Sequence, residues 1–419
     1  MAGPGGDMTP RSAVVVGAGI VGLSTAWFLQ DRGVHVTVVE RDEVGAGASW
    51  GNAGWLSPGL AMPLTSPHVL AEGLHGLADR RAPLSIPVRP DPRLWGFLLR
   101  FAAHCRTRYW RQAVQDYLPL LTESLPAFDT LAAEGVEVAA HDASVVAGFG
   151  TKRASDGLVR ELALVRRLGV PVSFDDLDRD ELRTLRPQLS DRAIAGVRLD
   201  GQRFVDPGRL LDGLALSVVS RGATVRPRFT VSSITADRGR IAVFPEEGPP
   251  VTADVAVVAT GARLDDLVRS PGVRTRVRAG RGYSFSVPTD APVTGPIYLP
   301  GVRVACTPYR GQLRVAGTME FRASDDPMDV KRVDAIVDSA RPLLTGVRWD
   351  ERSRPRVGSR PVTADALPVL GATRQPGVFV AGGHGMWGVT LGPVTGRLLA
   401  EQITTGKQPA ELIPFDPLR

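Results

Sequence analysis

The sequence predicts an α/β fold, in which a second domain with an antiparallel sheet is inserted into a parallel-sheet domain. Three observations predict it. Residues 13–40 have the pattern of strand, glycine turn, helix and strand, and residues 378–405 have the pattern of strand, glycine turn and helix. Between them, residues 274–354 alternate strand-like runs with turns, which is typical of an antiparallel sheet. We therefore expect the two ends of the chain to share one domain.

Residues 13–40 contain the strongest motif. A β-branched run leads into Gly17-Ala18-Gly19-Ile20-Val21-Gly22, and a helix continues to about residue 30. The first glycine allows a tight turn, the second lets a pyrophosphate approach the backbone, and the third lets the helix pack close to the strand. The helix N-terminus offers free N–H groups to phosphates. The next strand ends at a carboxylate that can accept both ribose hydroxyls of an adenosine and disfavours a 2′-phosphate. These features predict a Rossmann-like dinucleotide site at Gly17, Gly19, Ile20, Val21, Gly22, Glu40 and Arg41, with a fortuitous glycine turn as the alternative.

Composition is that of an ordinary globular protein of 419 residues, with 43% apolar and 22% charged residues. The formal net charge is +6, but arginines are spread along the chain and no basic run is interleaved with aromatic residues, so we expect no nucleic-acid binding. The two cysteines lack metal-ligand spacing, so no metal site is expected. We see no signal peptide or run of about 18 apolar residues. The expected location is cytoplasmic, with peripheral contact at the inner membrane face as an open alternative.

The stretch 45–54 holds four glycines in ten residues and cannot form a stable helix. Such a loop suits backbone lying against a flat ligand, with a mobile surface loop as the alternative. The residues assigned to the ligand here are Ser49, Asn52, Ala53 and Gly54.

Residues 94–104 form an apolar helix with arginines around it. It is either a core-facing amphipathic helix or a basic patch that rests on a membrane surface.

The middle of the chain is expected to alternate helices and strands. Helices are predicted at 112–134, 151–168, 175–185 and 207–220, the last with Asp206 as its N-cap and Pro207 in its first turn. Strands are predicted at 136–138, 144–149 and 194–199, and paired strands at 223–234 and 241–244. A further buried strand near 253–258 ends in Ala-Thr-Gly, a turn that can lie beside a bound dinucleotide. Val231, Thr260 and Gly261 are assigned to that site.

The last part of the chain carries a second glycine-rich turn, 382–393, after a buried strand, with a helix expected from about Pro393 to residue 405. A second phosphate site is one interpretation. The spacing better suits a helix N-terminus aimed at a flavin ring, where its dipole stabilises negative charge that develops on reduction. The residues assigned here are Gly383, His384, Gly385, Gly388, Val389 and Thr390.

With these residues in view, the chain resembles the FAD-dependent amino-acid oxidoreductases of the D-amino-acid oxidase superfamily, and especially the bacterial D-amino-acid dehydrogenase branch. The matching pieces run through the chain in family order: Val16–Gly22, Asn52–Gly54 with Ser57–Gly59, Arg281–Ser284, Arg314–Glu320, Arg360–Asp365 and Gly383–Pro393. The resemblance implies FAD held by segments 8–90, 201–273 and 355–419, and a substrate domain formed by 91–200 and 274–354. Some relatives attach FAD through a histidine or cysteine, but 45–54 contains neither, so non-covalent FAD is predicted. It also implies hydride transfer from an amine carbon to flavin N5, giving an imine that water hydrolyses to an oxo acid.

The resemblance places Arg360 at the family position for binding the substrate carboxylate, which a guanidinium fork matches with two parallel bonds. A surface ion pair is the alternative. Tyr283, and less strongly Tyr309, are candidates for hydrogen bonds to the substrate, with simple packing as the alternative. His384 is interpreted as a flavin-contacting or site-shaping residue rather than a general base, and Trp387 as a wall of the substrate pocket.

Several activities remain open at this point. The substrate is an amino acid, with a D-amino acid favoured, or glycine, sarcosine, hydroxyproline, an opine or another secondary amine, and a biosynthetic tailoring reaction is a further alternative. The electron acceptor is O₂ or a quinone or other carrier. A flavin-binding subunit without catalysis and an NAD-linked dehydrogenase are the remaining rivals.

Overall fold

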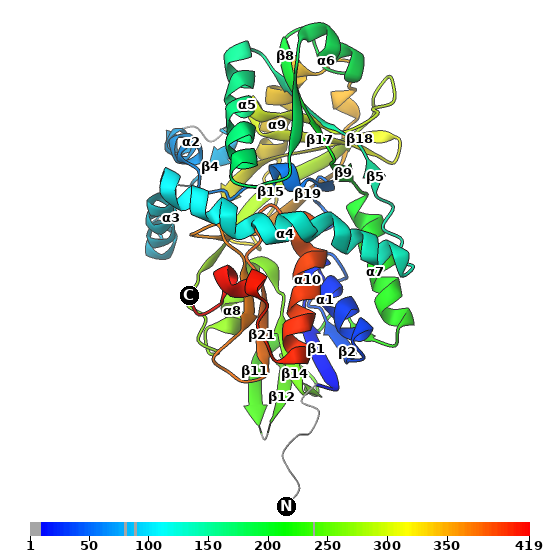
Figure 1. Ribbon diagram of the computed structural model, residues 1–419, viewed down its shortest axis with the longest axis vertical. Coiled ribbons are helices and arrows are strands. Elements are labelled where there is room, and N and C mark those ends of the chain that lie inside the picture. Colours follow the sequence, from blue (N-terminus) through cyan, green and yellow to red (C-terminus); the bar gives the residue numbers. More distant parts are fainter. Residues whose placement is uncertain (1–9, 79–81, 88–89, 238) are drawn as a thin grey trace, which may run out of the picture.

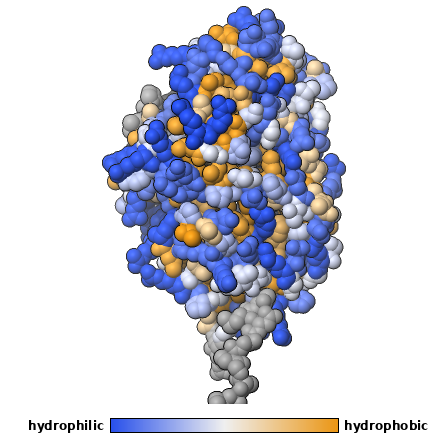
Figure 2. Space-filling model, in the orientation of Figure 1, coloured by the Kyte–Doolittle hydropathy of each residue, from blue (hydrophilic) through white to orange (hydrophobic). Residues whose placement is uncertain are grey.

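The computed structural model describes residues 10–78, 82–87, 90–237 and 239–419. The expected domain boundary at residue 8 lies outside these residues. In Figure 1 the long helix α4 (Thr107–Ala133) crosses the middle of the molecule, with β1, β2, α1 and α10 on one side of it and α5, α9 and β8 on the other. Figure 2 shows that hydrophilic side chains cover most of this face and that apolar ones are visible between them.

A mostly parallel sheet follows the order β10-β2-β1-β14-β21-β20, in which only β20 runs antiparallel to its neighbour. Its strands are β1 (Ser12–Val16), β2 (His35–Val39), β10 (Thr224–Arg226), β14 (Val255–Val258), β20 (Val369–Ala372) and β21 (Val378–Gly382). Ala13 and Val15 of β1 face a core formed with helices, whereas Val14 and Val16 face a second core. Burial on both faces explains why this strand is an unbroken apolar run.

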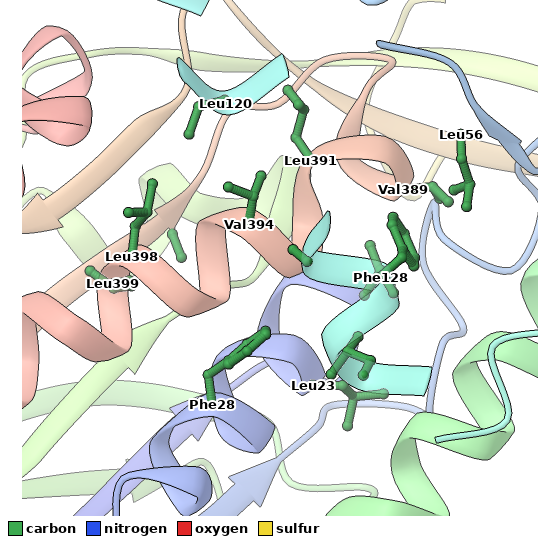
Figure 3. Packing of buried hydrophobic residues seen from close by; sticks show 14 of the residues in the cluster. Leu23, Phe28, Leu56, Leu120, Phe128, Val389, Leu391, Val394, Leu398 and Leu399 are labelled. Carbon is green, nitrogen blue, oxygen red and sulfur yellow. The ribbon is translucent and has the colours of Figure 1, made fainter. Parts of the chain in front are cut away.

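Helices α1 (Ile20–Asp31), α7 (Pro207–Ser220) and α10 (Gly388–Thr405) pack on the first of these faces. The other face is covered by α8 (Leu264–Val268) and by a small antiparallel sheet of β11 (Val231–Asp237), β12 (Arg240–Pro245) and β13 (Val251–Ala253). Figure 3 shows side chains of α1, α4 and α10 meeting in one apolar cluster, with Leu23, Phe128 and Val394 among its members. The segments predicted at the two ends of the chain are therefore packed together.

A larger sheet has the order β19-β15-β18-β17-β16-β6-β8-β7, with β4 (Leu84–Ser85) beside β18. Its strands are β6 (Val145–Phe149), β7 (Ser173–Leu177), β8 (Ala195–Asp200), β15 (Val277–Val287), β16 (Ile297–Leu299), β17 (Val304–Tyr309), β18 (Gln312–Phe321) and β19 (Ser353–Thr363). All these neighbours are antiparallel except β16 with β6 and β18 with β4. The expected antiparallel sheet in 274–354 is thus part of a wider one.

The remaining elements connect or cover these sheets. They are α2 (Pro67–Ala78), α3 (Pro92–His104), α5 (Lys152–Arg167), α6 (Arg179–Leu185) and α9 (Val330–Ala340), with a small sheet of β3 (Trp55–Leu56), β9 (Arg203–Phe204) and β5 (His141–Asp142). Asp206 caps α7 as predicted, because its side chain accepts hydrogen bonds from the N–H groups of Gly208 and Arg209. Leu94, Phe97 and Phe101 on α3 are buried, so this helix does face a core.

Four of the predicted secondary-structure elements differ from those in the structure. Residues 136–138 form no strand, and 175–177 belong to β7, where Asp175 pairs with Arg198 across the ladder, rather than to a helix. The run 223–234 is divided between β10, which joins the parallel sheet, and β11. Helix α10 begins at Gly388, with Pro393 inside it. In each case tertiary pairing or packing overrides local propensity.

In the described part of the chain, no helix combines the length and the apolar character that crossing a bilayer requires.

The contact between α1 and α10 is so close that Gly396 has no room for a side chain, since a Cβ there would lie 2.6 Å from the backbone carbon of Ser24. We expect Gly396→Ala to lower the free energy of unfolding by about 1–3 kcal/mol through overpacking, as measured by urea denaturation. The matched control is Gly96→Ala on α3, where a Cβ meets no atom within 4 Å. The free energy of unfolding of that variant should rise by up to ~1 kcal/mol. An unchanged midpoint for Gly396→Ala would contradict the packing argument.

Candidate functional site

A cavity of about 1470 Å³ lies between the carboxyl ends of β1, β2 and β14 and the larger sheet. Typical small-molecule pockets have volumes of about 300–1,000 Å³, so this one has room for a dinucleotide together with a second small molecule. The carboxyl edge of a parallel sheet is where ligands bind in such folds. Most of the residues predicted to bind a cofactor lie on its wall: Gly17, Gly19, Ile20, Val21, Glu40, Arg41, Ser49, Asn52, Ala53, Val231, Thr260, Gly261, His384, Gly385, Gly388 and Val389.

The first glycine turn leaves a bare backbone surface at the cavity. Gly17 has a φ of +111°, and a Cβ there would lie 2.5 Å from the Ala259 carbonyl oxygen. Gly22 lies outside the cavity wall, and its Cβ would lie 1.9 Å from the Gly17 carbonyl oxygen. Only glycines allow this strand–turn–helix contact. Gly19 precedes α1 and faces the cavity, where Ser49 Oγ accepts a hydrogen bond from the N–H of Ile20 at 3.1 Å.

Glu40 is fixed at the end of β2 by backbone hydrogen bonds. Its Oε2 accepts from the N–H of Ala18 at 2.7 Å, and its Oε1 accepts from the N–H of Asp42 at 3.1 Å. Each carboxylate oxygen keeps a lone pair for a further donor such as a ribose hydroxyl. The Arg41 guanidinium pairs with Asp42 at 2.7 Å and approaches Asp325 at 3.7 Å, so its charge is largely compensated.

An unpaired buried hydroxyl shows that the cavity suits a polar ligand. Thr260 Oγ1 is buried beside the cavity without a hydrogen-bond partner, and an orphaned polar atom of this kind is costly unless a ligand or water satisfies it. Gly54, in contrast, does not line the cavity. A Cβ there would lie 2.2 Å from the Val205 carbonyl oxygen, so this glycine serves the contact with the chain leading into α7.

The N-terminus of α10 opens into the same cavity as that of α1. The first bond inside α10 runs from the N–H of Leu391 to the carbonyl of Trp387, at 2.9 Å, which leaves the preceding N–H groups without intrahelical partners. Gly388 and Val389 line the cavity, whereas the Thr390 hydroxyl donates to the Trp55 carbonyl at 3.0 Å and lies outside it. Gly383 also lies off the main cavity wall, at a turn with a φ of +77°.

His384 is buried between this turn and α10. Its Nε2 lies 2.9 Å from the Thr395 hydroxyl, and its exposed fraction is 2%. Burial lowers the pKa of the imidazole to about 4. The ring is therefore neutral near pH 7 and a weak base, in keeping with a site-shaping role.

Arg360 on β19 carries a positive charge at the cavity wall without a carboxylate partner in the described structure. Its Nη1 donates to the Thr318 carbonyl at 2.8 Å, and burial lowers its pKa to about 10, so the group stays charged at neutral pH. The guanidinium lies directly over Gly282, where a Cβ would be 2.1 Å from Nη2. A guanidinium of this kind can bind a carboxylate through two parallel hydrogen bonds.

Tyr283, another substrate candidate, also lines the cavity, but its hydroxyl is already engaged inside the protein. The Tyr283 hydroxyl donates to Glu320 Oε2 at 2.8 Å in the interior, and desolvation together with this carboxylate raises its pKa to about 12. Tyr309 does not line the cavity, and its ring lies beneath the guanidinium of Arg314. Trp387 does line the cavity, and its Nε1 donates to the Met62 carbonyl at 2.8 Å.

The sequence analysis missed a group of charged residues on the cavity wall: Glu161 of α5, His68 and Glu72 of α2, and Arg303 before β17. No motif marks them, because they come from three separate elements. One backbone signal accompanies them: Arg303 and Thr318 have positive φ values of 55° and 59°, a conformation that favours glycine and clusters at functional sites.

Neither cysteine is a cavity residue. Cys306 is completely buried in the core of the larger sheet, and Cys105 is buried beside α3. Within the described ranges, no group of three or more His, Cys, Asp or Glu side chains is arranged to hold a metal ion.

The buried imidazole of His384 makes stability depend on pH. Unfolded histidine binds a proton below about pH 6.5, whereas His384 in the folded chain stays neutral down to about pH 4. The unfolded state therefore gains protons first as the pH falls between these values, and the folded state loses up to ~3 kcal/mol of relative stability.

We expect His384→Gln to lose less stability than the wild type between pH 6.5 and 4, as measured by denaturant midpoints across that range. The exposed His35→Gln is the control and should follow the wild type. Parallel pH curves for His384→Gln and the wild type would contradict the assignment.

Comparisons with known proteins agree with this architecture. A family model described as FAD dependent oxidoreductase (DAO) matches residues 12–402. The chain is 30% identical over 400 residues to a D-amino acid dehydrogenase of Xylella fastidiosa, covering 93% of this chain and 91% of that one. Among solved structures, glycine oxidase from Geobacillus kaustophilus superposes with a TM-score of 0.77 at 23% identity, covering 98% of both chains. Iminodiacetate oxidase from Chelativorans sp. BNC1 superposes with a TM-score of 0.71 at 21% identity, covering 97% of this chain and 98% of that one. The chain belongs to the DAO family of FAD-dependent oxidoreductases.

Proposed function

We propose that this enzyme oxidises the amine carbon of an amino acid, with a D-amino acid as the favoured substrate, to an imine that water hydrolyses to an oxo acid. The observation that carries the proposal is Arg360, a charged guanidinium at the cavity wall with no carboxylate partner among the described residues. The 30% identity to a D-amino acid dehydrogenase over nearly the whole chain supports the same substrate class.

We propose that different segments of the chain bind the cofactor and cover the substrate. Segments 8–90, 201–273 and 355–419 would hold FAD, and 91–200 with 274–354 would cover the substrate. The cofactor would contact the two glycine turns, the loop 45–54, Glu40 and Thr260. The unpaired Thr260 hydroxyl and the bare Gly17 and Gly19 backbone fit such a ligand. Bound FAD would supply the acceptor for the hydride that leaves the amine carbon.

The chain's own groups would orient the substrate rather than exchange protons with it. Arg360 would hold the substrate carboxylate with its remaining N–H groups, while its Nη1 stays fixed on the Thr318 carbonyl. The N-terminus of α10 would place its free N–H groups and positive dipole end where negative charge accumulates. His384, with its low pKa, would remain neutral there.

The electron acceptor is proposed to be O₂ or a quinone or other carrier. Peripheral contact with a membrane would favour a quinone as the acceptor. Helix α3 has an exposed surface that suits such membrane contact. Leu99 is 71% exposed there, between the exposed Arg93 and Arg100. Peroxide formed in equal amount to substrate oxidised under air would establish an oxidase, and dye reduction without peroxide would establish a dehydrogenase.

The experiment that tests the function is anaerobic bleaching of the bound flavin by a panel of amino acids and secondary amines, in both enantiomers. We expect D-amino acids to bleach it. A FAD-loaded protein that no amine bleaches would overturn the proposal.

Arg360→Gln should lower kcat/KM by about 30-fold or more, because a buried charge partner is lost, while FAD content stays unchanged. The control is Arg397→Gln on α10, whose guanidinium pairs with Glu123 at 2.8 Å away from the cavity. That variant should keep wild-type kinetics. Equal kinetics for Arg360→Gln and Arg397→Gln would remove Arg360 from the site.

Gly282→Ala tests the position of the same guanidinium without changing its charge. The added Cβ would overlap the Arg360 side chain, at 2.1–2.4 Å from its terminal atoms, and must displace it. We expect KM for the substrate to rise about tenfold, with FAD retained as judged by the visible spectrum. An unchanged KM would show that the guanidinium position does not matter for binding.

A further inference from the structure

We propose that Glu161 on α5 recognises a positively charged group at the far end of the substrate, so that the substrate class is an amino acid carrying a second amino or guanidino group. The inference rests on the proposed function and adds to it the chemistry of the side chain. It follows from where Glu161 lies, from its lack of a partner, and from its relation to Arg360.

One face of α5 forms part of the cavity wall. The residues of this face recur at helical spacing, and they are Ala154, Gly157, Leu158, Glu161, Leu162 and Val165. Leu162 and Val165 are buried apolar residues, whereas Glu161 is exposed toward the cavity. A carboxylate in the middle of an otherwise small or apolar helix face has no packing role there. Glu161 instead places the one negative charge of this α5 face against the cavity.

Glu161 lacks the partner that its charged neighbours have. Arg303 donates to Glu72 Oε1 at 3.0 Å, and His68 Nε2 lies 3.2 Å from the same oxygen. Glu72 thus compensates Arg303, which also lies 3.4 Å from the Tyr298 hydroxyl. Across the described ranges, no group donates a hydrogen bond to Glu161 or forms an ion pair with it.

The surroundings of Glu161 only partly stabilise its negative charge. Desolvation raises its pKa, and the more distant charges of Arg303 and His68 offset only part of this shift. A carboxylate that faces a cavity is stabilised by a ligand that brings a positive charge and hydrogen-bond donors. An ammonium or guanidinium group meets both needs, and an acidic side chain would meet repulsion.

The larger sheet links this carboxylate to Arg360. Val304, the residue after Arg303, pairs with Gly317 across β17 and β18, and the next residue, Thr318, accepts the hydrogen bond from Arg360. Arg303 thus precedes a strand that pairs with β18, the strand whose Thr318 carbonyl holds Arg360, and the charge of Arg303 acts on Glu161. Arg360, Met319, Leu158 and Glu161 all line the same cavity. In the proposed binding mode the substrate carboxylate lies at Arg360 and its side chain runs toward Glu161. Apolar walls between two opposite charges suit a chain of methylene groups.

The first experiment measures binding without turnover. Aminoalkanoates with a carboxylate at one end and an amine at the other, from four to eight carbons, have no α-amine to oxidise, and unsubstituted alkanoates of equal length are their neutral matches. Binding to the FAD-loaded protein is followed by calorimetry and by the shift in thermal denaturation. We expect at least one aminoalkanoate to bind about tenfold or more tightly than its match, and Glu161→Gln to abolish that difference. Equal affinities in the wild type would overturn the proposal.

The matched control is Glu351→Gln, which removes an exposed carboxylate at an ion pair with Arg348, away from the cavity. It should leave the preference for aminoalkanoates unchanged. If it weakened that preference as much as Glu161→Gln does, the effect would be one of overall charge and the assignment would fail.

The second experiment uses substrates and separates this inference from the proposed function. Lysine, ornithine and arginine are compared with norleucine, methionine and glutamate, in both enantiomers, by anaerobic bleaching of the flavin. We expect the basic amino acids to have the highest kcat/KM, and Glu161→Gln to raise KM for them about tenfold while norleucine is unaffected. A preference for neutral or acidic amino acids would overturn the inference alone, whereas no bleaching by any amine would overturn the function itself.

Discussion

The close packing of α1 against α10 is the constraint on which the site depends. These helices come from the two ends of the chain, and each begins at a glycine-rich turn after a strand of the parallel sheet. Gly396 lets the backbones approach until no side chain fits between them. Because both helices start at the carboxyl edge of one sheet, their contact brings two sets of free N–H groups and two positive dipole ends to a single cavity. If α1 and α10 lay further apart, their N-termini would face two separate spaces and not one shared cavity.

The cavity wall carries three polar groups that lack a partner of matching charge or hydrogen-bonding capacity among the described residues. They are the Thr260 hydroxyl, the Arg360 guanidinium, which has no carboxylate partner, and the Glu161 carboxylate, which has no cation. For the buried Thr260 hydroxyl and the desolvated Arg360 guanidinium this costs stability in the free protein. The surrounding structure holds them in place: the Thr318 carbonyl fixes Arg360, and the absence of a side chain at Gly282 leaves the guanidinium its space. This arrangement is the basis for the proposed substrate with opposite charges at its two ends.

The placement of the two tyrosines illustrates how far a residue type predicts a role. Tyr283 itself lines the cavity, while its hydroxyl donates to Glu320 on the neighbouring strand. Tyr309 is stacked under Arg314. Strand alternation sends successive side chains to opposite faces of a sheet, so a tyrosine on a strand beside a site need not face it, as Tyr309 shows.

The sequence by itself determined the strand–turn–helix units at both ends, the Asp206 cap and the family, because these depend on local spacing, glycine conformation and short-range hydrogen bonds. It also singled out most of the residues that the structure brings together on one cavity wall. Only the tertiary structure decided that 175–177 joins a strand, that α10 begins at Gly388, and that Gly54 serves packing. The charged group of Glu161, Glu72 and Arg303 likewise appears only after folding, because its members lie far apart in sequence and meet through the packing of α5 and α2 around the larger sheet.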